Sequence, residues 1–78
     1  MSYKILIADD EAEIRDLLHL YLENSGYDVF EAQDGLEALA ILEKEHVDLA
    51  ILDVMMPGMN GLRVLKKLRE TSNIPVMV

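Results

Sequence analysis

The sequence has no cysteine and no tryptophan, and only seven of its 78 residues are basic. Without thiols, the chain can form no disulfide, no thiolate metal site and no cysteine nucleophile. Fifteen acidic residues set the formal net charge at −8, which opposes direct contact with nucleic acid phosphates and favours basic partners. The functional chemistry must therefore come from side chains other than thiols, and carboxylates are the most abundant of these.

Long hydrophobic runs are also lacking. The amino-terminal segment M-S-Y-K-I-L-I-A-D-D has a short apolar stretch that acids interrupt, which fits neither a signal peptide nor a membrane span. We therefore expect a cytoplasmic protein without membrane contact. The length allows one domain at most, which we assign to residues 1–78.

What is present is a regular alternation of strand and helix patterns. Apolar runs predict strands over 3–8, 47–52 and 75–78, and alternating β-forming residues predict a strand nearer the sheet edge over 27–32. Amphipathic spacing predicts helices over 11–25, from 34 onward and over 61–71. Asp34 and Glu37 have the spacing of a capping box at the start of the second helix, and Gly26 is a natural stop for the first. This βαβαβαβ order predicts an α/β domain with a parallel sheet and right-handed crossovers.

Side chains spaced three and four residues apart are expected to face the core. They are Ile14, Leu17, Leu18, Tyr21 and Leu22 in the first helix, Ala38, Leu39 and Leu42 in the second, and Leu62, Val64, Leu65 and Leu68 in the third. His19 and His46 lack a second ligand at any metal-binding spacing, so we expect them on the surface without a role.

The third predicted strand is almost entirely apolar, as is typical of a strand that a parallel sheet buries on both faces. It ends at Asp53, and Pro57 and Gly58 follow within five residues. The chain must therefore turn away from the sheet at its carboxyl edge, where open α/β sheets bind ligands. We expect Asp53 to lie at the mouth of a cleft.

A second acidic group, Asp9, Asp10 and Glu11, follows the first predicted strand in the same way. If the two strands are neighbours, at least three carboxylates converge and repel one another, so a cation is expected between them. A site made only of oxygen ligands suits a hard divalent cation such as Mg²⁺. Glu11 is expected mainly to interact with the dipole of the first helix.

These motifs carry a family resemblance. The Asp9-Asp10 pair after K-I-L-I-A, Asp53 within L-A-I-L-D-V-M-M-P-G-M-N-G, and the final I-P-V-M-V resemble the receiver domain of two-component response regulators. The run D-V-M-M-P-G-M-N-G-L, followed by K-K-L-R, is similar to the transcription-factor branch in which a winged-helix DNA-binding domain follows the receiver. The resemblance covers all 78 residues. It implies a flavodoxin-like, doubly wound parallel sheet with strand order 2-1-3-4, and a fragment in which the fifth strand and the last two helices are absent.

The resemblance also implies site residues and partners. Asp53 matches the phosphoacceptor, which takes a phosphoryl group from a phosphohistidine of a sensor histidine kinase and so regulates an output, transcription in this branch. Asp10 and Asp53 match ligands of Mg²⁺ or another divalent cation such as Mn²⁺, with Asp9 acting through water and Met55 through its backbone carbonyl. The residues that match the loop over the site are Pro57, Gly58 and Gly61. The Thr or Ser that follows the fourth strand in the family, and the Lys that ends the fifth, would come after Val78.

Other functions remain open. One alternative is a partial receiver that serves solely as an interaction module. Such a chain would associate with itself through the exposed last strand and the uncovered face of the sheet. A Mg²⁺-dependent phosphatase also forms an aspartyl phosphate, but its D-x-D-x-T motif does not match residues 8–12. A flavin-binding sheet fits poorly because the first loop is acidic. The chain is therefore expected to be a phosphoacceptor domain rather than an enzyme that turns over an external substrate.

Overall fold

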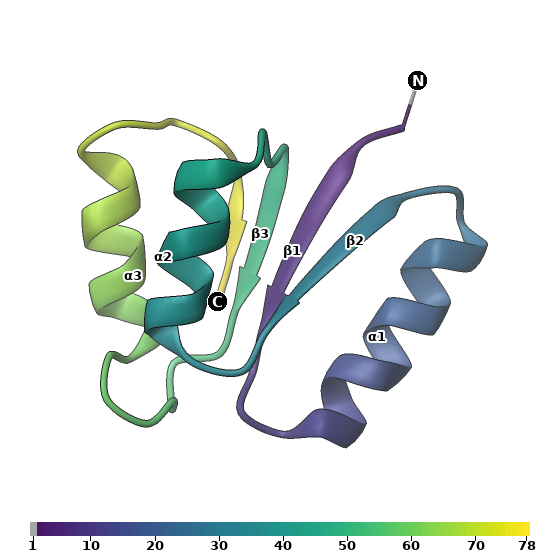
Figure 1. Cartoon of the computed structure of the whole chain (residues 1–78), viewed down its shortest axis with the longest axis horizontal. Coiled ribbons are helices and arrows are strands. Elements are labelled where there is room, and N and C mark those ends of the chain that lie inside the picture. Colours follow the sequence, from purple (N-terminus) through teal and green to yellow (C-terminus); the bar gives the residue numbers. More distant parts are fainter. Residues whose placement is uncertain (1) are drawn as a thin grey trace.

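The structure, a computed structural model, describes residues 2–78 as four parallel strands and three helices (Figure 1). In chain order the elements are β1 (Lys4–Ala8), α1 (Ala12–Asn24), β2 (Asp28–Ala32), α2 (Gly35–Lys44), β3 (Leu49–Leu52), α3 (Gly61–Arg69) and β4 (Val76–Met77). The strand order is β2-β1-β3-β4, and all three strand pairs are parallel. The α/β class, the element order and the strand order are as predicted, whereas β3 and β4 are each two residues shorter than the sequence pattern indicated.

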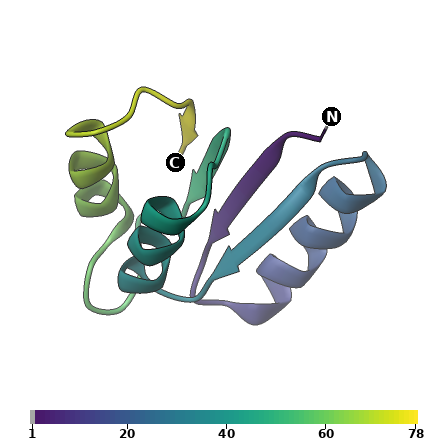
Figure 2. The same ribbon diagram turned by 45° about the horizontal axis from the view of Figure 1, so that its top comes forward.

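The helices lie on both faces of the sheet (Figure 2). Because strand side chains alternate between faces, Leu6, Ala8, Ala50 and Leu52 point to the side of α2 and α3, where they form the main core. Ile5 and Ile7 face the other side and are also buried. The predicted buried centre of β1 is therefore confirmed, and apolar side chains are buried on both faces of this strand.

The predicted apolar stripe on α1 is wrong in part. Leu17 and Tyr21 are 65% and 71% exposed, and Ile14 is 40% exposed. The half-buried residues of this helix are Arg15, Leu18, His19 and Leu22. The helix packs on β2 and β1 through a face shifted by one residue, so a polar pair takes two of the inward positions.

Two further burial predictions need correction. Leu49 and Ile51 of β3 are only half-buried, because α1 covers β2 and β1 and leaves this face of β3 with less cover. The strand is therefore fully buried on one face rather than on both. Leu62 of α3 is 54% exposed, since the helix packs through Val64 and Leu68.

The helix ends follow the local signals. Asp34 Oδ1 accepts a hydrogen bond from the Glu37 N–H at 2.8 Å, as predicted. The Glu37 carboxylate returns to the N–H of Gln33 rather than to that of Asp34, so the capping box is displaced by one residue. Gly26 adopts φ 93° after α1 and permits the N–H of Tyr27 to reach the carbonyl of Leu22 at 3.2 Å.

The length and hydropathy of the helices in residues 2–78 are insufficient for any of them to cross a lipid bilayer.

Candidate functional site

The first acidic group and Asp53 leave the sheet side by side. Ala8 of β1 is paired with Leu52 of β3, and the N–H of Asp53 donates to the carbonyl of Ala8 at 2.8 Å. On the other side of β1, the N–H of Asp9 donates to the carbonyl of Ala32 at 3.1 Å. The parallel ladder thus extends one residue past each strand and fixes both aspartates at the carboxyl edge of the sheet.

The carboxylates of Asp9, Asp10 and Asp53 converge as the sequence predicted. Each offers an oxygen that lies within 4.8 Å of the other two. Asp9 and Asp53 are half-buried, and Asp10 is exposed. Two negative charges at this separation repel by about 3–4 kcal/mol at an effective dielectric constant near 20. A bound cation would therefore lower the repulsion between the carboxylates. The all-oxygen donor set fits a hard divalent cation better than a soft metal.

Backbone N–H groups orient two of the three carboxylates. The N–H of Glu11 donates to Asp9 Oδ1 at 2.9 Å, and the N–H of Met55 donates to Asp53 Oδ1 at 3.2 Å. Both are local contacts across two residues, a turn pattern that aspartate favours. The side chain of Met55 is 78% exposed, so the contact of this residue with the site comes from its backbone.

Gly61 determines how closely the loop after β3 returns to Asp53. A Cβ at Gly61 would lie 2.3 Å from the carbonyl oxygen of Asp53 and 3.2 Å from the Cα of Val54. The N–H of Gly61 also donates to the carbonyl of Val54 at 3.2 Å. Only glycine permits this approach, so the first residue of α3 sets the position of the backbone that carries the central carboxylate.

The remaining predicted loop residues have different surroundings. Pro57 and Gly58 are exposed, and Gly58 adopts φ 76° with open space around it, so its role is conformational. Asn60 caps α3, since its Oδ1 accepts a hydrogen bond from the N–H of Arg63 at 3.0 Å. Gly35 was not anticipated: a Cβ there would lie 2.4 Å from the carbonyl oxygen of Met59, so the start of α2 supports the same loop.

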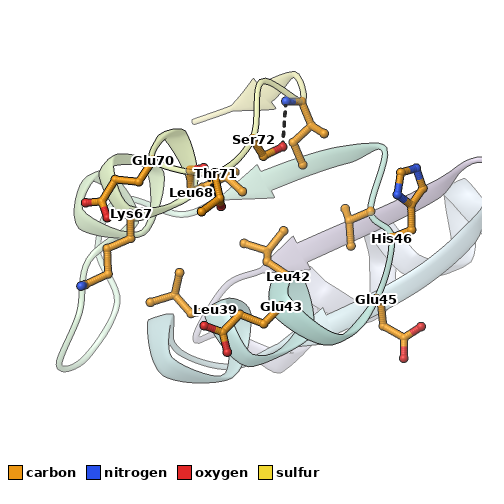
Figure 3. Close-up of a pocket in the computed structure, with 12 residues that line it drawn as sticks. Leu39, Leu42, Glu43, Glu45, His46, Lys67, Leu68, Glu70, Thr71 and Ser72 are labelled. Atoms are coloured by element: carbon orange, nitrogen blue, oxygen red, sulfur yellow. Dashed lines mark hydrogen bonds between the residues drawn. The ribbon is translucent and has the colours of Figure 1, made fainter.

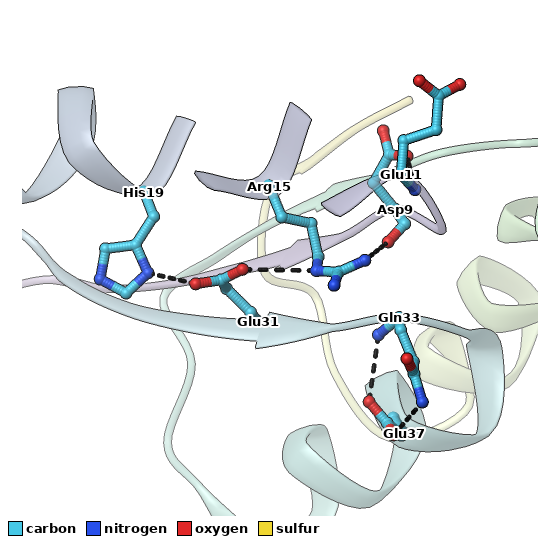
Figure 4. Close-up of polar contacts among 7 residues, drawn as sticks. All are labelled: Asp9, Glu11, Arg15, His19, Glu31, Gln33 and Glu37. Carbon is cyan, nitrogen blue, oxygen red and sulfur yellow. Dashed lines mark hydrogen bonds and ion pairs between the residues drawn. The ribbon is translucent and has the colours of Figure 1, made fainter. Parts of the chain in front are cut away.

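A polar cluster next to the site was also missed by sequence reasoning (Figure 4). Arg15 Nε lies 3.3 Å from Glu31 Oε1, and His19 Nδ1 lies 2.6 Å from Glu31 Oε2. The hydrogen bond to Glu31, followed by one to Glu23, raises the pKa of His19 above its usual 6.5. His19 was expected on the surface without a role, whereas it is half-buried and paired with Glu31; the pair could not be anticipated because the two residues are 12 positions apart and meet only in the folded chain. The four-residue spacing of Arg15 and His19, which places both on one face of a helix, was the sequence signal that could have revealed this cluster.

A groove lies at the opposite edge of the sheet, away from the acidic group (Figure 3). It is bounded by the last turns of α2 and α3 and by the segment that precedes β3, with Leu39, Leu42, His46 and Leu68 among its lining residues. None of the three clustered aspartates lines it. His46 is 87% exposed at its side chain, in agreement with the expected surface position.

A parallel sheet with helices on both faces and with carboxylates that converge at its carboxyl edge defines an α/β domain whose candidate site lies where open α/β sheets bind ligands. The family described as "Response regulator receiver domain" matches residues 5–78. The chain therefore belongs to the receiver domains of response regulators.

Known relatives support this assignment. The chain is 49% identical over its 78 residues to the regulatory protein VanR of Enterococcus faecium, of which it covers 34%. It is 38% identical to the chemotaxis response regulator CheY4 of Vibrio cholerae, with a TM-score of 0.94 over 97% of this chain and 66% of that one. The chain thus spans about a third of the length of the curated relatives it matches.

A third relative has been solved with ligands and with a partner. The response regulator TrrA of Thermotoga maritima, in complex with Mg(2+)-BeF, is 41% identical, with a TM-score of 0.86 over 90% of this chain and 61% of that one. TrrA has also been solved in complex with the histidine kinase ThkA, where the TM-score is 0.88 at 39% identity, over 95% of this chain and 65% of that one.

Proposed function

We propose that Asp53 is the phosphoacceptor of this receiver domain, and that it takes a phosphoryl group from a phosphohistidine of a sensor histidine kinase in a reaction that requires Mg²⁺. The observation that carries the proposal is the convergence of three carboxylate oxygens within 4.8 Å at the ends of β1 and β3. The complexes of TrrA with Mg(2+)-BeF and with ThkA support it by similarity.

The transfer uses a single side chain of the protein, Asp53, as the nucleophile. A carboxylate oxygen of Asp53 attacks phosphorus, the P–N bond to the histidine breaks, and its electron pair returns to the imidazole ring. The product is an aspartyl phosphate. The Met55 N–H orients the attacking carboxylate through Oδ1, and the N–H of Gly61 donates to the carbonyl of Val54, which connects the start of α3 to the residue after Asp53.

The metal ligands remain proposals. Asp10 and Asp53 would bind Mg²⁺, or another divalent cation such as Mn²⁺, directly, with Asp9 acting through water and Met55 through its carbonyl. When bound, Mg²⁺ offsets negative charge on the phosphoryl oxygens and lowers the repulsion between the carboxylates. Pro57, Gly58 and Gly61 would shape the loop that covers the site; they lie in or next to that loop.

The output is also a proposal. VanR and the response regulator GtcR of Aneurinibacillus migulanus are each about three times as long as the match to this chain, since it covers 34% and 32% of them. The "Probable transcriptional regulator ycf27" of Porphyridium aerugineum, to which the chain is 48% identical over 75 residues, supports an output in transcription. We propose that residues 1–78 form the amino-terminal part of a receiver that controls transcription through a separate DNA-binding domain. The net charge of −8 opposes direct contact of this segment with nucleic acid phosphates. The cytoplasmic location stays a prediction.

Intact-mass spectrometry tests the proposal. The chain would be incubated with a small acyl phosphate donor, with and without Mg²⁺, beside an Asp53→Asn variant. We expect a gain of one phosphoryl group that depends on Mg²⁺ and is lost in Asp53→Asn. A folded sample that gains no mass, or gains it equally in Asp53→Asn, would rule out Asp53 as the acceptor in this chain.

Exposed apolar side chains favour a second function, which is association with another protein or with a second copy of the chain. On α1, Leu17, Leu20 and Tyr21 are 65%, 59% and 71% exposed, and Met77 of β4 is 60% exposed. Surfaces of this kind support association with another protein or a second copy of the chain. Sedimentation velocity over a range of concentrations tests self-association, and a single monomeric species at all concentrations would exclude it.

A further inference from the structure

The Arg15 side chain connects α1, β2 and the loop that carries the first acidic group (Figure 4). Its Nη1 donates a 2.6 Å hydrogen bond to the backbone carbonyl of Asp9, while its Nε is paired with Glu31. Only 16% of the Arg15 side chain and 29% of the Glu31 side chain are exposed. Solvent therefore screens these contacts less than it would on an open surface.

The carbonyl that Arg15 contacts belongs to the peptide unit between Asp9 and Asp10. A peptide unit is planar from one Cα to the next, so the direction of its C=O bond determines where the Asp10 Cα lies relative to Asp9. The Asp9 N–H is already held by Ala32, and Asp9 Oδ1 is held by Glu11. The hydrogen bond from Arg15 to the Asp9 carbonyl therefore restrains the plane of the peptide unit between Asp9 and Asp10.

Glu31 keeps the guanidinium in this place. It uses its two carboxylate oxygens on two residues of α1 that are one turn apart, Arg15 at 3.3 Å and His19 at 2.6 Å. A side chain held on both sides loses rotational freedom before any ligand binds. The direction of the Arg15 fork is therefore set by the packing of α1 on β2.

We infer that Arg15 is a positioning residue for the acidic cluster. It acts through the Asp9 carbonyl and keeps Asp9 and Asp10 oriented so that their carboxylates reach that of Asp53. It is not itself a ligand of the cation or of the phosphoryl group. Its functional consequence rests on the proposed function, because Mg²⁺ binding requires the converged carboxylates.

Removal of Arg15 has two opposite effects on Mg²⁺ affinity. Loss of a positive charge near three carboxylates would by itself strengthen the binding of a cation. Loss of the hydrogen bond to the Asp9 carbonyl would weaken it, because the ligands would no longer be held in place. The direction of the change therefore separates a positioning role from a simple charge effect.

Isothermal titration with Mg²⁺ measures that direction. Arg15→Met keeps much of the aliphatic stem, and Lys66→Met, on the exposed side of α3, removes the same charge away from this contact. We expect the Kd for Mg²⁺ to rise about tenfold in Arg15→Met and to stay unchanged or fall in Lys66→Met. Arg15→Lys should also raise the Kd, because one ammonium group cannot reproduce the two-sided guanidinium contact. A Kd in Arg15→Met equal to or below that of the wild type would overturn the inference.

A measurement without metal separates this inference from the proposed function. The ¹⁵N heteronuclear NOE of the Asp10 and Glu11 amides should fall in Arg15→Met and remain at the wild-type value in Lys66→Met. Unchanged NOE values in Arg15→Met would show that the contact does not hold the segment, and would overturn the inference. If the wild type binds no Mg²⁺, the proposed function fails, while the NOE comparison still decides the positioning role.

Discussion

Replacement of Gly61 by alanine tests the close approach of the start of α3 to the Asp53 backbone. The added Cβ would lie 2.3 Å from the Asp53 carbonyl oxygen and 2.9 Å from the Asp53 carbonyl carbon. Both are backbone atoms in the direct continuation of β3, so neither can move aside without a shift of the strand end or of α3. We therefore expect Gly61→Ala to weaken the fold and to displace Asp53.

The size of the effect follows from two opposing terms. Overpacking a tight site costs about 1–3 kcal/mol, and occasionally more. Alanine gains up to about 1 kcal/mol over glycine within a helix, with less at its first residue. The expected net loss is about 1–2 kcal/mol, which lowers the melting temperature of a chain of this size by roughly 4–8 °C for each kcal/mol.

Urea unfolding followed by far-ultraviolet circular dichroism measures this loss, since the chain has no tryptophan for fluorescence. Leu62→Ala is the matched control, because Leu62 is the next residue of α3 and is 54% exposed. The control should stay within about 0.5 kcal/mol of the wild type. If the urea concentration at the midpoint of unfolding were the same or higher in Gly61→Ala than in the wild type, the close approach would impose no constraint on Asp53. That result would refute the reasoning.

Three other outcomes follow from the same structure. Asp34→Ala removes the cap of α2 and should cost about 1 kcal/mol in urea unfolding, whereas Asp34→Ser should retain most of it. Because the pKa of His19 is raised in the folded state, its pair with Glu31 stabilises the fold fully below about pH 6.5, and this contribution disappears as the pH rises through the folded pKa. Unfolding free energies measured between about pH 5.5 and 8.5 should show that loss, and His19→Gln should remove it; an identical slope in the variant would contradict the assignment. Leu6→Ala, at a fully buried position, should cost about 2–5 kcal/mol and leave little folded protein, while Leu17→Ala, at a position that is 65% exposed, should change stability by less than about 0.5 kcal/mol.

The sequence predicted correctly the features that depend on residues close to one another along the chain. The order of strands and helices, the Asp34 cap and the stop at Gly26 follow from local propensity and periodicity, which the tertiary structure has no reason to override. The convergence of Asp9, Asp10 and Asp53 was also predictable, because parallel strands in neighbouring positions bring their carboxyl ends together.

The same patterns failed where burial depends on which element lies opposite. Leu17 and Tyr21 have the spacing of a core stripe, yet they are exposed, since α1 meets the sheet through Leu18, Leu22 and a polar pair. The helical period indicates that an apolar face exists, but not which neighbour covers it.

Local chemistry in the chain thus determined the elements, their order and the identity of the carboxylate cluster, because each of these depends on residues close in sequence or on the rules of parallel sheets. Only the tertiary structure decided the support around that cluster. The Arg15 contact with the Asp9 carbonyl and the approach of Gly61 to Asp53 are set by the rotation of α1 and the return path of a loop. Such distances depend on how whole helices and strands pack, and the spacing of residues along the sequence does not determine them directly.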